Sequence, residues 1–261
     1  MARGESNSGT VVKALALLDL VAQFGKPIRF ADLHSKSALP KATLHRFLRT
    51  LCDEGMLVQN RENRTYSLGM RLVKLAHNAW KHASLGEVAR CHLDSLAERV
   101  GETIHLAQLE NGQVLYIDKR NAAAPIEMFS SAGKVGPAYC TGVGKAMLAY
   151  LEEPTKSLAL GQQAYFAYTP NTLTCQDRLR QELDRIRDRG LAIDHEEHEP
   201  GIICVATPIR SGPRVVGALS ITSSVRRHNI DSLLGYKHLL DQTARTIGEE
   251  AAIWQFPARR N

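Results

Sequence analysis

Two short motifs contain residue types that could support catalysis, and neither has the spacing that the chemistry needs. Residues 195–198 read His-Glu-Glu-His, with histidines three positions apart, whereas zinc proteases carry HExxH on a helix. Lys145 follows a glycine, as in a phosphate loop, yet Ala146 occupies the place of the hydroxyl residue that holds magnesium. A solvated acidic loop explains the first motif better. We therefore predict no metal centre, no cofactor and no enzymatic activity.

The segment 140–145, Cys-Thr-Gly-Val-Gly-Lys, could instead bind a small anion. It leads into a predicted helix over residues 141–151, and its two glycines leave backbone N–H groups uncovered at the start of that helix. These groups lie at the positive end of the helix dipole, where a carboxylate is commonly bound. A tight turn required for packing is the alternative interpretation.

A second set of residues has the chemistry of nucleic-acid recognition. Between Leu39 and Gly55 apolar residues recur with a helical period, while the opposite side is basic and polar. Pro40 suits the first turn of a helix, and Gly55 suits the left-handed residue that ends one. The outward residues expected to contact phosphates and base edges are Lys41, Ala42, Thr43, His45, Arg46 and Arg49. A solvated helix surface is the alternative if this helix is considered alone.

The neighbouring elements would make this helix the second half of a helix-turn-helix. Apolar periodicity predicts a first helix that starts near Val11, and residues 30–36 predict a short second helix. After the basic helix, residues 56–68 predict two short strands joined by a polar loop, which form a wing. Arg61 and Arg64 of this loop are expected to contact DNA. A winged helix that binds only protein is the alternative.

Charge is distributed unevenly along the chain. Residues 1–75 contain 12 lysines and arginines against 6 aspartates and glutamates, so they account for the whole formal net charge of +6. A basic small module joined to a neutral larger one indicates that the first part binds a polyanion. The five cysteines are dispersed, and no apolar run of roughly eighteen residues occurs. We therefore expect free thiols and a cytoplasmic protein without a membrane segment.

Residues 84–255 alternate between strand and helix patterns, which predicts an α/β (α+β) domain with an antiparallel sheet and flanking helices. The expected strands are 102–109, 112–119, 126–129, 191–194, 202–210 and 215–223. The expected helices are 68–83, 85–100, 141–151, 174–190 and 231–254, the first of them a connecting helix. Ser84 with Glu87, and Thr174 with Asp177, have the spacing of capping boxes.

Four motifs, in this order, resemble the IclR family of bacterial transcriptional regulators. They are residues 39–46 (LPKATLHR), residues 141–146 (TGVGKA), residues 169–172 (TPNT), and the set Asp194, His195, Glu196, Gly201, Cys204 and Pro208. The resemblance extends from about Val11 to about Gly248. It implies a winged helix-turn-helix DNA-binding domain (1–68), a linker helix (69–83) and a GAF-like effector-binding domain (84–255). It also implies dimers or tetramers that act on palindromic operators in double-stranded DNA.

The resemblance further implies an effector pocket, in which Tyr139 stands where the family commonly has histidine. The matching positions are Met128, Thr141, Gly142, Val143, Asp194, Cys204, Ser220 and Thr222. The N-terminus of a helix can bind a carboxylate, and the side chains of the wall can form hydrogen bonds with hydroxyl groups. The pocket therefore suits a sugar acid or hydroxy acid. We expect a repressor of a catabolic operon that responds to such an acid. An activator that responds to an aromatic acid, and an enzyme with a fused regulatory winged-helix head, are the alternatives.

Overall fold

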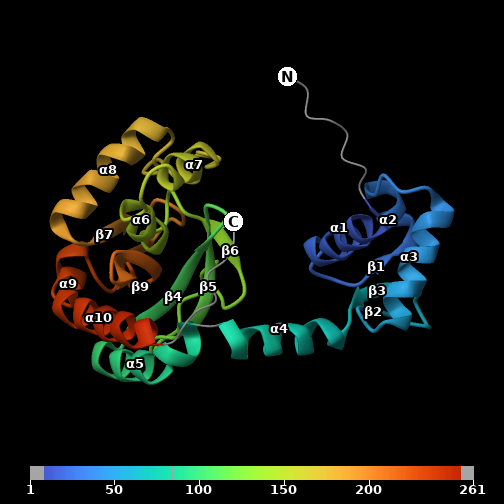
Figure 1. The fold of residues 1–261 in the computed structure, drawn as a ribbon, viewed down its shortest axis with the longest axis horizontal. Coiled ribbons are helices and arrows are strands. Elements are labelled where there is room, and N and C mark those ends of the chain that lie inside the picture. Colours follow the sequence, from blue (N-terminus) through green and yellow to red (C-terminus); the bar gives the residue numbers. More distant parts are fainter. Residues whose placement is uncertain (1–8, 84, 254–261) are drawn as a thin grey trace. The chain divides into compact units, whose positions relative to one another are not determined.

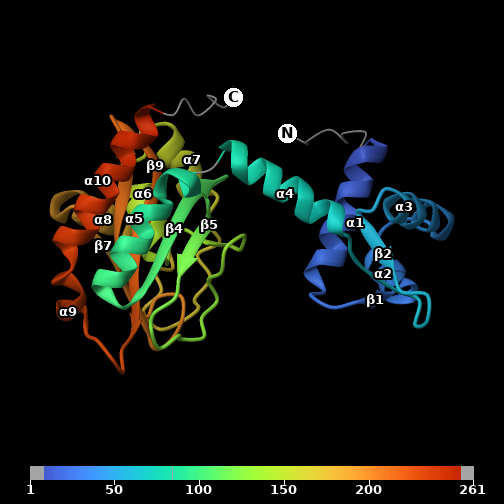
Figure 2. The ribbon, with the colours of Figure 1, turned by 90° about the horizontal axis from the view of Figure 1, so that it is seen from below.

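The apolar stripes of the sequence become the buried sides of helices in two structural units, Met1–His82 and Ala83–Asn261. The computed structural model describes residues 9–83 and 85–253, and Figures 1 and 2 show the elements of each unit from two sides. The first unit is mainly helical, with a small sheet. In the second, helices cover both faces of a larger sheet. The predicted fold class is confirmed.

The described part of the first unit begins with three helices and three short strands. They are α1 (Thr10–Gln23), β1 (Ile28–Arg29), α2 (Phe30–Lys36), α3 (Lys41–Asp53), β2 (Leu57–Gln59) and β3 (Thr65–Leu68), with strand order β1-β3-β2. Leu44 and Phe47 of α3 lie in one buried cluster with Leu17 of α1 and Leu33 of α2. Gly55, at φ 68°, is left-handed, and the chain turns there from α3 towards β2. The expected helix-turn-helix and wing are therefore present. The strand β1 was not predicted, and it adds a third strand to the sheet of the wing.

The helix α4 (Met70–Ala83) follows the wing. It begins two residues later than predicted because Leu68 is the last paired residue of β3. Its apolar side chains at Met70, Val73 and Leu75 are 67, 57 and 50% exposed. The start of α4 thus presents an apolar surface to solvent in the single chain.

The second unit contains a six-stranded sheet with strand order β6-β5-β4-β9-β8-β7, in which every pairing is antiparallel. The strands are β4 (Thr103–Glu110), β5 (Gln113–Arg120), β6 (Val135–Pro137), β7 (Ala192–His195), β8 (Ile202–Ser211) and β9 (Arg214–Ser224). One face packs against α5 (Leu85–Val100), α9 (Ile230–Leu234) and α10 (Lys237–Ile253). The other packs against α6 (Gly142–Ala149), α7 (Thr155–Gly161) and α8 (Gln176–Arg189). Two apolar cores therefore lie on opposite sides of one sheet.

Several predictions for this unit are wrong. Residues 126–129 form no strand, because the Phe129 N–H donates to the Glu199 carboxylate at 3.0 Å and the edge strand is β6 instead. The terminal helix is two helices, separated near Gly235. The capping box at Thr174 is absent, since α8 begins after Cys175 without a side-chain cap. The helix α7 was not expected, and the capping box at Ser84 falls outside the described residues.

Candidate functional site

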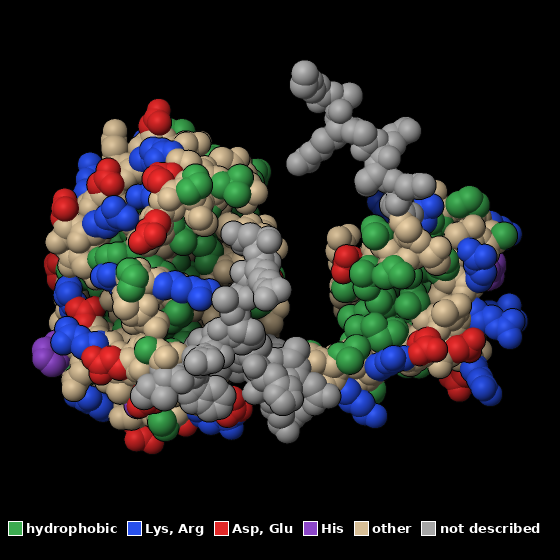
Figure 3. All heavy atoms as spheres, in the orientation of Figure 1, with side chains coloured by type: hydrophobic (Ala, Val, Ile, Leu, Met, Phe, Trp, Pro, Cys, Tyr) green, Lys and Arg blue, Asp and Glu red, His purple; other side chains and the backbone are tan. Residues whose placement is uncertain are grey.

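The helix α3 carries the basic side chains predicted to contact DNA. Lys41, Ala42, His45, Arg46 and Arg49 are exposed and Thr43 is half-buried, because the apolar side of the same helix fills the core. The His45 ring stacks on Phe30 of α2, with ring centroids 4.0 Å apart. In Figure 3, lysine and arginine side chains gather on the side of this unit where α3 lies in Figure 1. This surface has the charge and shape that a duplex groove requires.

The wing is a short hairpin whose tip is held by its own side chains. The Asn60 Oδ1 atom accepts from the backbone N–H groups of Glu62 at 2.9 Å and Asn63 at 3.3 Å. Arg64 adopts a left-handed conformation, with φ 55°. Both Arg61 and Arg64 are exposed at this tip. The hairpin therefore presents two guanidinium groups from an ordered turn.

The eight residues predicted to bind an effector meet around one small cavity in the second unit. The sheet register explains the convergence, because Thr222 lies opposite both Thr103 and Cys204, while Cys204 lies opposite Asp194. The N-terminus of α6 and an irregular segment around Met128 close the other sides. The cavity also has six lining residues that sequence reasoning missed: His105, Tyr116, Ser130, His198, Glu199 and Ile202.

Most hydroxyl groups of this cavity are organised by His105. Its Nδ1 atom lies 3.2 Å from both Ser220 Oγ and Thr222 Oγ1, and its Nε2 atom lies 2.7 Å from Ser130 Oγ. Burial lowers the pKa of His105 to about 3, and the nearby positive charge of Lys119 acts in the same direction. The imidazole is therefore neutral, and it contributes hydrogen bonds rather than charge.

The start of α6 lies directly against the sheet. Thr141 donates its hydroxyl hydrogen to the Pro137 carbonyl at 2.7 Å, which fixes the entry to the helix. A side chain on Gly142 would overlap the Cys204 sulfur, so only glycine allows this approach. The positive end of a buried helix therefore lines the cavity.

Asp194 is a buried carboxyl group on the wall of the cavity. Burial raises its pKa to about 7, against an opposing effect from the Lys145 ammonium, and Glu197 raises it further. Its Oδ1 atom accepts from the Glu197 N–H at 2.9 Å. Near neutral pH this carboxyl group therefore exists in both protonation states, and it can accept or donate a hydrogen bond.

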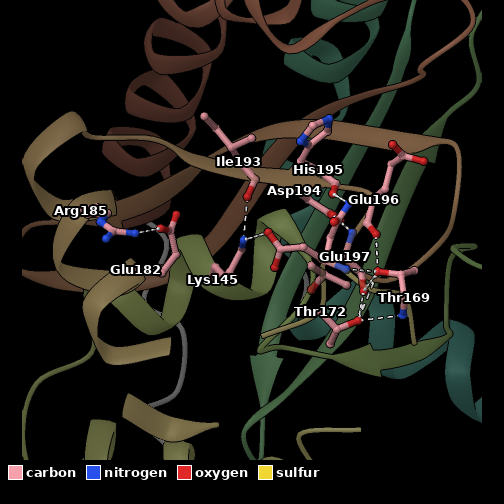
Figure 4. A network of polar contacts seen from close by, with 12 residues as sticks. Lys145, Thr169, Thr172, Glu182, Arg185, Ile193, Asp194, His195, Glu196 and Glu197 are labelled. Atoms are coloured by element: carbon pink, nitrogen blue, oxygen red, sulfur yellow. Dashed lines mark hydrogen bonds and ion pairs between the residues drawn. The ribbon is translucent and has the colours of Figure 1, made fainter. Parts of the chain in front are cut away.

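Figure 4 shows the polar network behind Asp194. The fully buried Lys145 ammonium forms an ion pair with Glu197 and donates to the Ile193 carbonyl at 2.7 Å. Since Glu197 is only 8% exposed, the segment 195–198 is not the solvated acidic loop that was expected. Lys145 lies in the core with its ammonium paired to Glu197, so it is not part of a phosphate-binding loop.

The motif at residues 169–172 explains how this polar segment is buried. The Thr169 hydroxyl donates to the Glu196 carbonyl and the Thr172 hydroxyl donates to the Glu197 carbonyl, each at 2.6 Å. The Asn171 side chain donates to the His195 carbonyl at 3.0 Å. Carbonyl groups at and beyond the end of β7 are thereby satisfied.

The described residues contain no metal-binding or membrane-spanning feature. Within residues 9–83 and 85–253, no three histidine, cysteine or acidic side chains are grouped so that they could hold a metal ion. Over the same ranges, no helix is long and apolar enough to cross a membrane. What the geometry offers is therefore a basic helical surface in one unit and a small cavity with polar and apolar lining in the other.

Comparison with known proteins matches both units. Residues 10–61 match the IclR helix-turn-helix domain, and residues 77–249 match the bacterial transcriptional regulator IclR C-terminal family. The HTH-type transcriptional regulator XynR of Escherichia coli is 33% identical, covering 91% of this chain and 95% of its own length. The transcriptional repressor IclR of the same species is 27% identical, over 91% of this chain and 88% of its own.

A solved structure shows the same fold. It is an IclR homologue from Microbacterium hydrocarbonoxydans complexed with 4-hydroxybenzoate, with a TM-score of 0.80 and 23% identity. The match covers 93% of this chain and 98% of that one. The arrangement of a helix-turn-helix unit and a helix-covered antiparallel sheet is thus common to both proteins.

Proposed function

The chain belongs to the IclR family of bacterial transcriptional regulators, and from this premise we propose that it is a repressor whose DNA binding responds to a small hydroxylated organic acid. As a member of this family it is a DNA-binding regulator and not an enzyme. A relative named as a transcriptional repressor supports repression as the direction of control. The effector class is supported by the chemistry of the cavity.

The observation that carries the effector class is the composition of the cavity wall. No lysine or arginine is among the described lining residues, so the start of α6 is the partner offered to a carboxylate. The Lys145 ammonium lies behind the wall and is already bound by Glu197. Asp194, Ser220 and Thr222 supply acceptors and donors for hydroxyl groups, and an ionised Asp194 would repel a second carboxylate. One carboxylate and several hydroxyl groups are the ligand features that this wall matches.

For DNA we propose that α3 enters the major groove and that the wing tip contacts the neighbouring backbone. Arg46 would read base edges, and Arg64 would contact phosphates. The proposed domains are 1–68 for DNA binding, 69–83 for the linker helix and 84–255 for effector binding. The exposed apolar side chains of α4 support an interface between copies, as dimers or tetramers on palindromic operators.

Effector binding would be transmitted as a change in wall structure. The cavity holds only about 30 Å³, which is roughly the room for a single water molecule. Any organic acid therefore has to displace part of the wall before it fits. We propose that this displacement alters the arrangement of two copies through α4, and with it the spacing of two recognition helices.

A thermal-shift screen of the full chain tests the effector class. D-gluconate, D-xylonate and other hydroxy acids should raise the melting temperature by several degrees at saturating concentration, whereas acetate and sorbitol should not. 4-Hydroxybenzoate serves as the aromatic comparison. The Thr222→Val variant, which removes a hydroxyl group from the wall, should weaken the hydroxy-acid response. A response to aromatic acids alone would refute the proposal, and loss of operator binding upon addition of the active acid would support repression.

A further inference from the structure

A second and larger cavity lies beside the one described above. It has a volume of about 470 Å³, and His198 and Glu199 line both cavities. Its lining also includes the aromatic residues Phe129, Tyr139 and Tyr168 and the amide residues Gln113, Gln162 and Gln163, beside the small and apolar residues 135–137 and Ala164. The shared wall means that the two spaces are separated by one layer of side chains.

The segment 128–130 lies between the two cavities. Met128 and Ser130 line the inner cavity, whereas Phe129, the residue between them, lines the outer one. The segment is attached by polar contacts, because the Phe129 N–H donates to both Glu199 carboxylate oxygens at 3.0 Å and Ser130 Oγ lies 2.7 Å from His105 Nε2. The Phe129 ring packs edge-on against His198, with centroids 5.3 Å apart. Movement of these three residues would therefore join the cavities.

The outer cavity has the surface chemistry that recognises sugar rings. Aromatic faces attract the C–H face of a pyranose, and Tyr168, which lines the cavity, is 44% exposed, whereas the Lys134 ammonium lies 4.7 Å from the centroid of the Phe129 ring. Tyr168 is oriented by an edge contact to His198, with centroids 4.7 Å apart. Side-chain amides such as that of Gln162 provide a donor and an acceptor for neighbouring hydroxyl groups. The wall is therefore suited to a neutral, hydroxylated ring.

We propose that the two cavities are the two ends of one binding site, and that the effector is a two-ring acid with its carboxylate at α6 and a neutral sugar ring in the outer cavity. The inner cavity of about 30 Å³ has no room for a second ring even after its wall admits an acid group, whereas the outer cavity of about 470 Å³ has the volume of ordinary ligand pockets. The inference rests on the proposed function. That function places the acid group of the ligand at the start of α6, and the inference assigns the remaining part of the same ligand. An aldonic acid that carries a glycosidically linked hexose is the simplest such molecule.

Calorimetric titration of the full chain tests this proposal. The probes are D-gluconate and three disaccharide acids, namely cellobionate, maltobionate and lactobionate. The tightest disaccharide acid should bind at least about tenfold more tightly than gluconate, since the second ring adds stacking and hydrogen bonds. Tyr168→Ala and Gln162→Ala should each weaken that acid about fivefold and leave gluconate within about twofold. Leu158→Ala, which changes an exposed α7 residue outside the lining, is the matched control and should alter neither.

The outcomes separate this inference from the proposed function. Equal affinity for gluconate and all three disaccharide acids, with no effect of Tyr168→Ala, would overturn the two-cavity site and leave the hydroxy-acid effector intact. Failure of every acid to bind would overturn both. A change in sedimentation of Tyr168→Ala without a change in affinity would show that a second copy covers the outer cavity, and it would also overturn the inference.

Discussion

Replacing Asp194 by asparagine should stabilise the protein, and the gain should grow as the pH rises. The Asp194 carboxyl is buried, and its pKa is raised from 3.8 to about 7. In the unfolded chain the same group ionises at its ordinary pKa. Asparagine has nearly the same shape, cannot ionise, and its Oδ1 atom can still accept from the Glu197 N–H. The substitution thus removes the cost of a buried negative charge and keeps the hydrogen bond.

The magnitude follows from the two pKa values. Between pH 3.8 and about 7 the folded protein holds a proton that the unfolded chain has lost, so the free energy of unfolding falls as pH rises through this window and levels off above it. Each pKa unit corresponds to about 1.4 kcal/mol. Between pH 5 and pH 8 about two units are crossed, which amounts to about 3 kcal/mol. The stability difference between Asp194→Asn and the parent should therefore widen by about 3 kcal/mol over this range.

Urea unfolding of both proteins at one protein concentration, followed by circular dichroism from pH 5 to pH 8, measures this difference. Groups that do not interact with Asp194 titrate alike in both proteins, so their contributions cancel in the comparison. Asp188→Asn, which changes an exposed carboxylate on α8, should show a difference that is constant with pH. A constant difference for Asp194→Asn, or one that shrinks at pH 8, would refute the assignment of a raised pKa to this group.

Four other substitutions test the remaining parts. Arg46→Ala should abolish preference for the operator, whereas Arg64→Ala should weaken operator and random DNA alike and reduce the salt slope by about 1; equal effects in gel-shift titrations would contradict this division. Gly142→Ala should abolish the effector response and preserve DNA binding, and Gly161→Ala, where a Cβ meets open space, is its control. Lys145→Met should lower the free energy of unfolding in urea by about 3–5 kcal/mol because it leaves a buried carboxylate unpaired, and a neutral change would show that the ion pair is dispensable.

The fold of the first unit follows closely from local sequence signals. The basic helix between Pro40 and Gly55 is present as α3, because apolar periodicity and terminal residues specify the same limits. The strand β1 has only two residues and no alternation to reveal it. Local chemistry thus predicts elements with a strong period and misses those that depend on pairing with a distant strand.

The candidate cavity could be predicted only in part, because it depends on sheet register. Family resemblance identified Asp194 and Ser220, whereas His105 joins them because β4 places it opposite Ser220. A histidine at an inward position of a predicted strand was the available signal. Glu197 was assigned to solvent because its sequence neighbours are charged, and only the tertiary structure shows that Lys145 pairs with it.

The order of strands in the sheet also has a consequence for synthesis of the protein. The winged-helix elements are complete at Leu68, whereas the central ladder pairs Thr103 with Thr222. Chains emerge from the ribosome N-terminus first, at about 5–20 residues per second, and domains fold as units. The winged helix-turn-helix can therefore fold seconds before β9, which carries Ser220 and Thr222 of the cavity wall, has been translated. A nascent or truncated chain that ends before β9 would bind DNA but would lack the residues needed to bind the effector.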